Sequence, residues 1–164
     1  MANENQLAEV NGLSVEQYLT FTLAGESYGL EILKVREIRG WEPVRDIPNT
    51  PDYIKGALNL RGTIVPIIDL RERFGMEKVE YSPVTVVIVL SFGDQKDNRV
   101  IGIVADAVSD VLDINQQDVR SAPNLGSKID TRYMQGMYVL DTRMIMLLDV
   151  NNLLNPEEFE NLIE

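Results

Sequence analysis

Apolar and polar residues alternate along several short stretches of the chain, with the period of two that is typical of half-buried β-strands. In Gln17–Leu23, leucine and phenylalanine fall on one face, and tyrosine and threonine on the other. A Gly-Glu pair then predicts a hairpin turn into a second strand over Tyr28–Ile32. Val86–Leu90 and Val100–Ala105 are apolar on both faces, which predicts interior strands. The pattern therefore predicts a fold dominated by β-structure.

Helical signals are short. Thr50 and the proline after it match an N-cap and a first helical position, and Gly56 is a typical residue just after the end of a helix. The sequence therefore predicts one helical turn over Pro51–Lys55. An aspartate and a glycine bracket a similar turn at Leu70–Phe74. Near the end, Asn155 and a following proline, with apolar residues at helical spacing, predict a C-terminal helix over residues 156–164.

A set of residues recurs about 75 to 80 positions further along the chain. This period is longer than a solenoid unit, so it indicates two related domains. Each copy has the order of elements of a small, five-stranded SH3-like barrel, and its last hairpin ends in an aspartate that caps a short helix. The first copy contains Gly29, Leu30, Val35, Glu37, Ile38, Tyr53, Gly56, Leu60, Ile67, Ile68 and Asp69; the second contains Gly102, Ile103, Val108, Asp110, Val111, Tyr133, Gly136, Leu140, Leu147, Leu148 and Asp149.

The predicted organisation is all-β with short helices: two SH3-like, five-stranded β-barrels that share a core, followed by a C-terminal helix. We divide the chain into a flexible N-terminal tail over residues 1–14, a first barrel half over 15–80, a second over 81–155 and the helix over 156–164. Pro66 interrupts the run Ile64–Ile68 and has no N–H for a β-ladder, so this strand is predicted to be an edge or bulged strand.

Composition removes most enzyme mechanisms. At 164 residues and 45% hydrophobic, the chain can bury a substantial core. It has neither cysteine nor histidine, which excludes disulfides, thiolate nucleophiles, histidine acid–base catalysis and Cys- or His-ligated metals, and which suits the cytoplasm. The net charge of −11 argues against nucleic acid as a partner. No apolar run approaches the roughly 20 residues that span a bilayer, so direct membrane insertion is not expected.

An alternative function uses the acidic residues. Asp106, Asp110 and Asp113 are close enough in sequence to suggest a metal-binding or acid–base site in a free-standing ligand-binding barrel or enzyme. They lack the alternate-residue spacing and the glycine of a calcium loop, and no base or nucleophile accompanies them. A solvated acidic face is the favoured interpretation, with no cofactor and no catalytic activity.

Six segments, taken together, have a recognisable sequence: Phe21–Leu23, Tyr28–Ile38, Ile54–Gly62, Val65–Arg71, Thr85–Val89 and Val108–Leu112. They resemble the CheW family of chemotaxis coupling proteins, and the resemblance covers nearly the whole chain from about Gln17. It implies two intertwined SH3-like barrels with a common core. It also implies an adaptor that joins the cytoplasmic tips of chemoreceptors to the regulatory domain of the histidine kinase CheA, in arrays beneath the membrane.

The resemblance implies two sets of contact residues. The receptor-facing set is Val35, Glu37, Ile38, Gly56, Arg61, Val86 and Val111. An apolar strip flanked by an acid and an arginine suits an amphipathic receptor helix, although the valines and isoleucine also fit a plain barrel core. The kinase-facing set is Arg120 and Leu125, where the family often has an aromatic residue in place of Leu125. A kinase regulatory domain or a response-regulator hybrid is a rival within the same family, but no receiver, phosphotransfer or ATP-binding motif accompanies the barrels.

Arg61 is predicted to be exposed and functional. It lies in the tight turn Leu60–Thr63, where a lone arginine is ordinarily a solvated charge that adds little to stability. Its counterpart in the repeat is Asp141, which has the opposite charge. This difference predicts a task that only the first copy performs.

Overall fold

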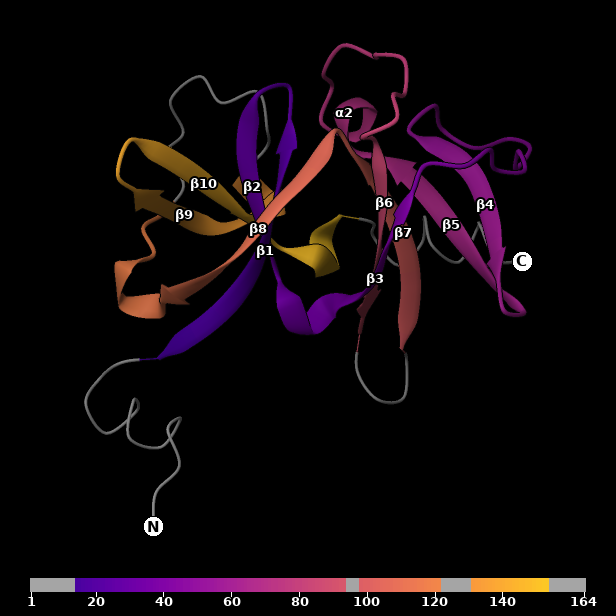
Figure 1. Cartoon of the computed structure of the whole chain (residues 1–164). Helices are drawn as coiled ribbons and strands as arrows, with labels where there is room; N and C mark the ends of the chain where they lie inside the picture. The colour runs from indigo at the N-terminus through magenta and orange to yellow at the C-terminus, as the bar shows by residue number, and fades with distance from the viewer. Residues whose placement is uncertain (1–13, 94–97, 122–130, 154–164) are drawn as a thin grey trace.

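The computed structural model describes residues 14–93, 98–121 and 131–153, and places their strands in two five-stranded sheets (Figure 1). Sheet A has the order β8 (Ala107–Asn115), β1 (Val15–Leu23), β2 (Glu26–Glu31), β10 (Arg143–Leu148) and β9 (Met134–Leu140). Sheet B has the order β3 (Val35–Gly40), β6 (Val86–Phe92), β7 (Arg99–Ala105), β5 (Thr63–Asp69) and β4 (Ile54–Leu60). The described helices are one turn each: η1 (Ile32–Lys34), α2 (Leu70–Arg73), η2 (Gln116–Asp118), η3 (Thr131–Tyr133) and η4 (Val150–Asn152).

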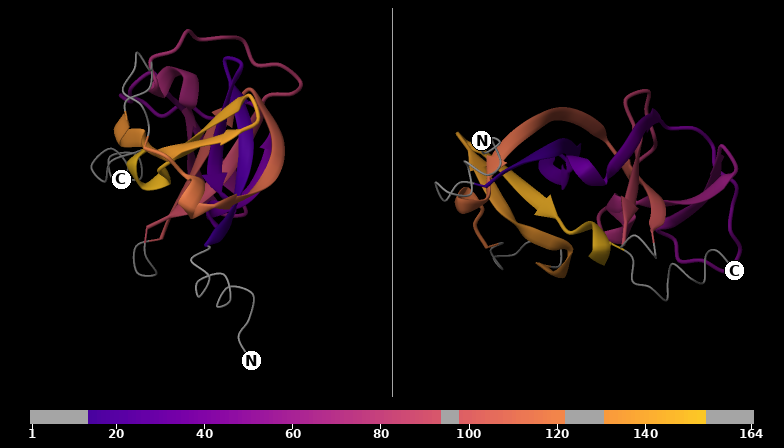
Figure 2. Two further views of the ribbon diagram at one scale, coloured as in Figure 1. Left: turned by 90° about the vertical axis from the view of Figure 1, so that its left-hand side faces the viewer. Right: turned by 90° about the horizontal axis from the view of Figure 1, so that it is seen from below.

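Each sheet takes strands from both parts of the chain, which corrects the expected division into residues 15–80 and 81–155. Sheet A combines β1 and β2 with β8, β9 and β10, whereas sheet B is built from residues 35–105. The chain crosses from sheet A to sheet B through η1 and returns at Asp106, between β7 and β8. Figure 2 shows the two lobes side by side, with η4 between them. The predicted tail and C-terminal helix lie outside the described residues.

The repeat is confirmed by equivalent strand pairing. Residues Ile67–Asp69 of β5 run parallel to β7, with Ile67 opposite Gly102, and β10 runs parallel to β2, with Leu147 opposite Gly29. A Cβ on Gly102 would lie 2.6 Å from Ile67 Cδ1, and one on Gly29 would lie 2.9 Å from Leu147 Cδ2. Both glycines therefore face the same close approach of a side chain from the neighbouring parallel strand.

Gly56 and Gly136 also occupy equivalent sites. The residue after each forms an isolated antiparallel bridge to an arginine, Ala57 to Arg45 and Met137 to Arg120. A Cβ on Gly56 would lie 2.1 Å from the Arg45 carbonyl oxygen, and one on Gly136 would lie 2.7 Å from that of Arg120. The environments match, although only Gly56 has a positive φ, 144°.

The aspartate caps match as well. Asp69 accepts from the Glu72 N–H at the start of α2, and Asp149 accepts from the Asn151 N–H at the start of η4. The N–H of Asp69 donates to the carbonyl of Tyr53, as that of Asp149 does to Tyr133. The predicted turn at Leu70–Phe74 is confirmed as α2, but Pro51–Lys55 contains only a non-helical turn before β4 begins at Ile54.

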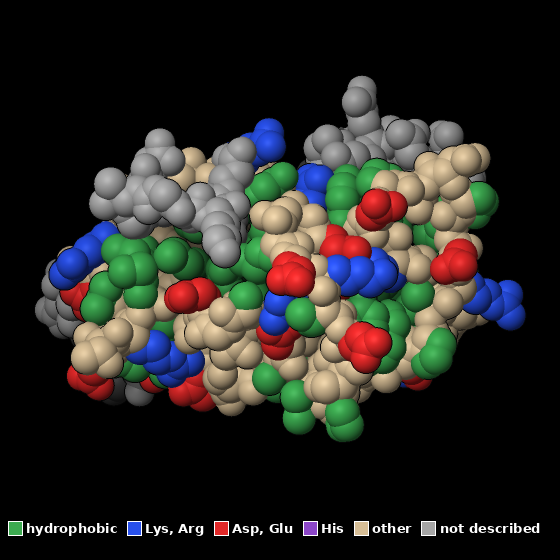
Figure 3. Space-filling model, turned by 90° about the horizontal axis from the view of Figure 1, so that it is seen from above, with side chains coloured by type: hydrophobic (Ala, Val, Ile, Leu, Met, Phe, Trp, Pro, Cys, Tyr) green, Lys and Arg blue, Asp and Glu red, His purple; other side chains and the backbone are tan. Residues whose placement is uncertain are grey.

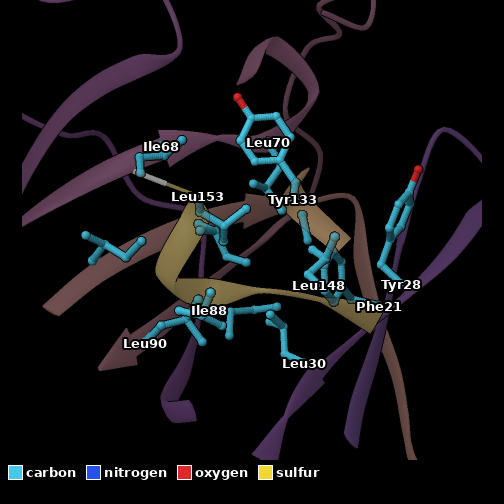
Figure 4. Close-up of a cluster of buried hydrophobic side chains, with 14 of the residues drawn as sticks. Phe21, Tyr28, Leu30, Ile68, Leu70, Ile88, Leu90, Tyr133, Leu148 and Leu153 are labelled. Carbon is cyan, nitrogen blue, oxygen red and sulfur yellow. The ribbon is translucent and has the colours of Figure 1, made fainter. Parts of the chain in front are cut away.

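A single buried cluster joins the two sheets, as the predicted shared core requires. Phe21, Tyr28 and Leu30 of sheet A belong to one cluster with Ile88 and Leu90 of sheet B, and Figure 4 shows Leu30 beside Ile88. Tyr133, Leu148 and Leu153, from the C-terminal part of the chain, fill the space between them and Leu70 of α2. We call this cluster the shared core. A second cluster, around Val65, Ile67, Val87 and Val89, fills sheet B itself.

Pro66 was predicted to lie in an edge or bulged strand, and the edge alternative was wrong, whereas the β4–β5 ladder does shift register next to it, between Ile54 and Gly56. β5 lies between β7 and β4. Its pairing with β7 begins only at Ile67, one residue after the proline. The missing N–H of Pro66 therefore removes no bond from the parallel ladder. Among the described residues, no helix is long and apolar enough to cross a membrane.

Candidate protein-binding surface

Strand β3 directs its side chains to two different places. Ile38 pairs with Ile88 of the shared core, and Val35 packs partly against that core. Glu37 and Arg39 instead pair with Val89 and Val87, whose side chains lie in the second cluster. Because side chains of a strand alternate between faces, β3 presents an apolar position to one side and charged positions to the other.

The predicted apolar residues gather around the shared core. Val35 and Val86 are half-buried and pack against it, while Ile38 is 43% exposed. Val111 is 47% exposed on β8, where it pairs with the buried Leu19. Val35 and Val86 thus contact the core, whereas Ile38 and Val111 lie on strands that pair with core residues and remain open to a partner.

Glu37 and Arg61 form an ion pair at the rim of sheet B. The Arg61 guanidinium donates to Glu37 Oε1 at 2.9 Å, and Arg39 lies 3.6 Å from the other carboxylate oxygen. The Arg61 side chain is 78% exposed, on a turn where its φ is 51°. The pair links the β4–β5 hairpin to β3, and the predicted exposure of Arg61 is confirmed.

Sheet A contains a matching pair that sequence comparison missed. Asp110, the counterpart of Glu37, lies 3.4 Å from the guanidinium of Arg143, at the start of β10. Asp110 also accepts a hydrogen bond from the buried Thr20 hydroxyl; this bond, together with Arg143, holds the pKa of the Asp110 carboxyl below its ordinary value. The second copy therefore also has a cation at its hairpin, Arg143, two residues after Asp141, the position equivalent to Arg61. This corrects the inference that only the first copy needs a cation at the hairpin.

The other predicted contacts are more scattered. Gly56 is buried against the backbone of Arg45 and has no side chain that could contact a partner. Its role is to let the segment around Arg45 pack closely on β4. Arg120 is exposed and held by two backbone hydrogen bonds of 2.8 Å to Met137. Leu125 lies outside the described residues. The repeat makes Arg45 the counterpart of Arg120, a match that the bridged positions reveal and the side-chain pattern alone did not.

Two arginines of α2 connect the sheets, and neither was predicted. Arg71 forms a two-pronged ion pair with Asp106. Arg73 lies 4.5 Å from the ring centre of Tyr53 and 5.3 Å from that of Tyr133, and donates to the Leu153 carbonyl at 2.9 Å. The paired tyrosines were visible in the repeat, but nothing in the sequence indicated a cation between them.

The three aspartates of the alternative function have separate partners. Asp106 binds Arg71, Asp110 binds Thr20 and Arg143, and Asp113 accepts from Gln17 at 3.0 Å. In the part of the chain that the structure describes, no three acidic residues come together as metal ligands. From above, acidic and basic side chains lie next to one another near the middle of the molecule (Figure 3).

Comparison with known proteins agrees with this architecture. The family model described as a CheW-like domain matches residues 17–158. The chain belongs to the CheW family. It is 48% identical over 159 residues to the chemotaxis protein CheW of Klebsiella aerogenes, covering 96% of this chain and 93% of that protein. It is 34% identical to CheW of Rhizobium meliloti, covering 88% and 90%.

A solved CheW structure has the same fold. The scaffolding protein TtCheW of Thermoanaerobacter tengcongensis superimposes with a TM-score of 0.77 and 33% identity, over 87% of this chain and 90% of that one. Membership of the CheW family thus rests on sequence and on structure, and it accounts for the two sheets, the repeat and the shared core together.

Proposed function

We propose that the protein is a chemotaxis adaptor that couples the cytoplasmic tips of chemoreceptors to the regulatory domain of a CheA-type histidine kinase. In this role it has no catalytic activity. It works in the cytoplasm, recruited to receptor arrays at the membrane. Family membership and the scaffolding function named for its structural neighbour support the proposal.

The observation that carries the proposal is the pair of edge strands β3 and β8. Each has an exposed apolar residue, Ile38 or Val111, and the acid directly before it, which points to the other face of the edge strand, pairs with a hairpin arginine. The inner side of each strand rests on the shared core. An amphipathic helix of a receptor can place its apolar stripe on such positions and fix its register with the charges.

For the kinase we propose a contact through Arg120 and Leu125. Arg120 lies beside β9, and β8 and β9 are the opposite ends of the strand order of sheet A. The exposed guanidinium of Arg120 can pair with a carboxylate of the partner. Separate surfaces allow the adaptor to hold the receptor and the kinase at the same time.

A reconstitution tests the proposal. The protein is mixed with membranes that carry a receptor cytoplasmic fragment and with a CheA-type kinase, and the co-sedimented fraction of each is measured. We expect the kinase to sediment only when the adaptor is present, and we expect no phosphate on the adaptor after mixing with autophosphorylated kinase. Failure of the adaptor to sediment with receptor, or stoichiometric phosphorylation of this chain, would refute the proposal.

A further inference from the structure

The Arg71–Asp106 ion pair joins three separate segments. Arg71 Nε donates to Asp106 Oδ1 at 2.9 Å, and the terminal nitrogen donates to Oδ2 at 2.5 Å. The Arg71 side chain is 15% exposed and that of Asp106 is 30% exposed. Asp106 Oδ2 also accepts from the N–H of Ala24, in the β1–β2 turn, at 2.9 Å. We call this arrangement, formed by Arg71, Asp106 and Ala24, the clasp.

The clasp lies where the chain passes from one sheet to the other. Asp106 is the single residue between β7 of sheet B and β8 of sheet A, and its own N–H donates to the Thr22 carbonyl at 3.0 Å. The other crossing, η1, has Leu33 at the equivalent position of the repeat, and that side chain is 91% exposed. Leu33 has no charged group, whereas the Asp106 carboxylate links its crossing to Arg71 of α2.

Strand β8 needs this tie more than an interior strand does. It is an edge strand and pairs with β1 alone. Its pairing is also irregular, because the register shifts between Leu19 and Phe21, opposite the stretch from Val108 to Val111. A strand held on one side, with an interrupted ladder, is a segment that opens at low free energy. The clasp holds the end of β8 that lies next to this irregular stretch.

We propose that Arg71 and Asp106 are positioning residues that hold the start of β8, so that Asp110 and Val111 are presented to the receptor in a fixed place. The inference rests on the proposed function. The shared core fixes the two sheets relative to one another, but Asp110 and Val111 are exposed and do not belong to it. Their position therefore depends on how β8 is held at its ends and along β1.

The test compares three single substitutions in the full-length protein. Arg71→Met keeps an unbranched apolar stem and removes the guanidinium, and Asp106→Asn removes the charge. Lys55→Met is the matched control. Lys55 pairs with Glu72 of the same short helix, at 16% and 14% side-chain exposure, but it lies on β4 and touches neither crossing. Each variant is measured for thermal unfolding, for hydrogen exchange, and for binding to a receptor cytoplasmic fragment and to a CheA regulatory domain.

For Arg71→Met and Asp106→Asn we expect faster exchange in residues 107–111 and a receptor affinity that falls roughly 5- to 30-fold. We expect kinase affinity to stay within about twofold, because the proposed kinase contact shares no residue with the clasp or with β8. Lys55→Met unfolds at a lower temperature but binds receptor within about twofold of the wild type.

Two results would overturn the inference. One is unchanged receptor affinity in both clasp variants, whether or not β8 exchanges faster. The other is an equal loss of receptor affinity in Lys55→Met, which would indicate a general effect of stability. If the wild-type protein itself fails to bind the receptor fragment, the proposed function fails, while the exchange measurement still reports whether the clasp holds β8.

Discussion

Sheet B pairs Glu37 with Arg61 at its rim, and sheet A pairs Asp110 with Arg143 at the equivalent rim. The Arg61 side chain is 78% exposed, and its guanidinium donates to Glu37 at 2.9 Å. Arg143 is 34% exposed and also donates to the hydroxyls of Ser27 and Thr20. The arginine of sheet B is thus accessible to a partner, whereas the equivalent arginine of sheet A is held in a polar network. Duplicated barrels can divide recognition and stability between equivalent positions.

The largest effect is expected at the matched glycines. Gly56→Ala forces a Cβ to within 2.1 Å of the Arg45 carbonyl oxygen at a φ of 144°, so we expect a loss of about 3 kcal/mol or more in the free energy of unfolding. Gly136→Ala meets its backbone neighbour at 2.7 Å without a positive φ and should lose about 1 to 3 kcal/mol. Urea unfolding measures both. A larger loss for Gly136→Ala would contradict this ranking.

The polar network of sheet A should come next. Thr20 is fully buried, its hydroxyl donates to the Asp110 carboxylate, and it accepts from the Asp110 N–H at 3.1 Å. Thr20→Val keeps the shape and removes the hydroxyl that bonds both Asp110 groups, so we expect a loss of about 1 to 3 kcal/mol. Thermal and urea unfolding check the value, with Thr22→Val on the same strand as a control. An unchanged stability would mean that the network does not support sheet A.

Arg61→Ala should change stability less than either. An exposed ion pair contributes about 0 to 1 kcal/mol, so we expect the urea midpoint to stay close to that of the wild type. Arg143→Ala should lose more, because three hydrogen-bonding partners lose their donor. If Arg61→Ala unfolds more readily than Arg143→Ala, the proposed division between the two pairs is reversed.

The smallest effect is the dependence of stability on pH. Burial alone would raise the pKa of Asp106, but hydrogen bonds from Arg71 and Ala24 outweigh it, and the pKa lies below the ordinary 3.8. The Asp110 pKa is lowered too, by Thr20 and Arg143. The stability due to these carboxylates is fully present above the unfolded pKa and is lost as the pH falls through the folded one. Urea unfolding at pH 7, 5 and 3 measures this effect. Between pH 7 and pH 3 the free energy of unfolding should fall less for Asp110→Asn than for the wild type, and an equal fall would contradict the lowered pKa of Asp110.

The strands and the repeat could be predicted because they depend on local pattern. Alternation marks Gln17–Leu23 as a strand, and the glycines and capping aspartates recur in order because both copies use the same close approaches and the same helix caps. The family resemblance implied intertwined barrels, but the pattern alone could not assign each strand to its sheet, because a period of two defines the faces of a strand and not its neighbours. Pro66 was misread for the same reason, since the start of a parallel ladder depends on the partner strand.

The candidate site was only partly predictable. The resemblance selected Glu37 and Arg61, which the structure joins. It did not select Arg143 or the clasp, because Arg71 and Asp106 are 35 residues apart and each has the appearance of an ordinary surface charge in the sequence. Charged pairs between distant segments leave no periodic signal, so they emerge only when the topology is known.

The most direct test of the account measures how Arg61→Ala and Arg143→Ala bind a receptor cytoplasmic fragment, by titration into membranes that carry it. The account predicts that Arg61→Ala weakens binding by roughly 1 to 3 kcal/mol, as for an interface hot spot, while its unfolding remains that of the wild type. Arg143→Ala should unfold more readily and bind the receptor within about 1 kcal/mol of the wild type. Unchanged binding by Arg61→Ala would return this arginine to a solvated charge and contradict its assignment as a receptor contact.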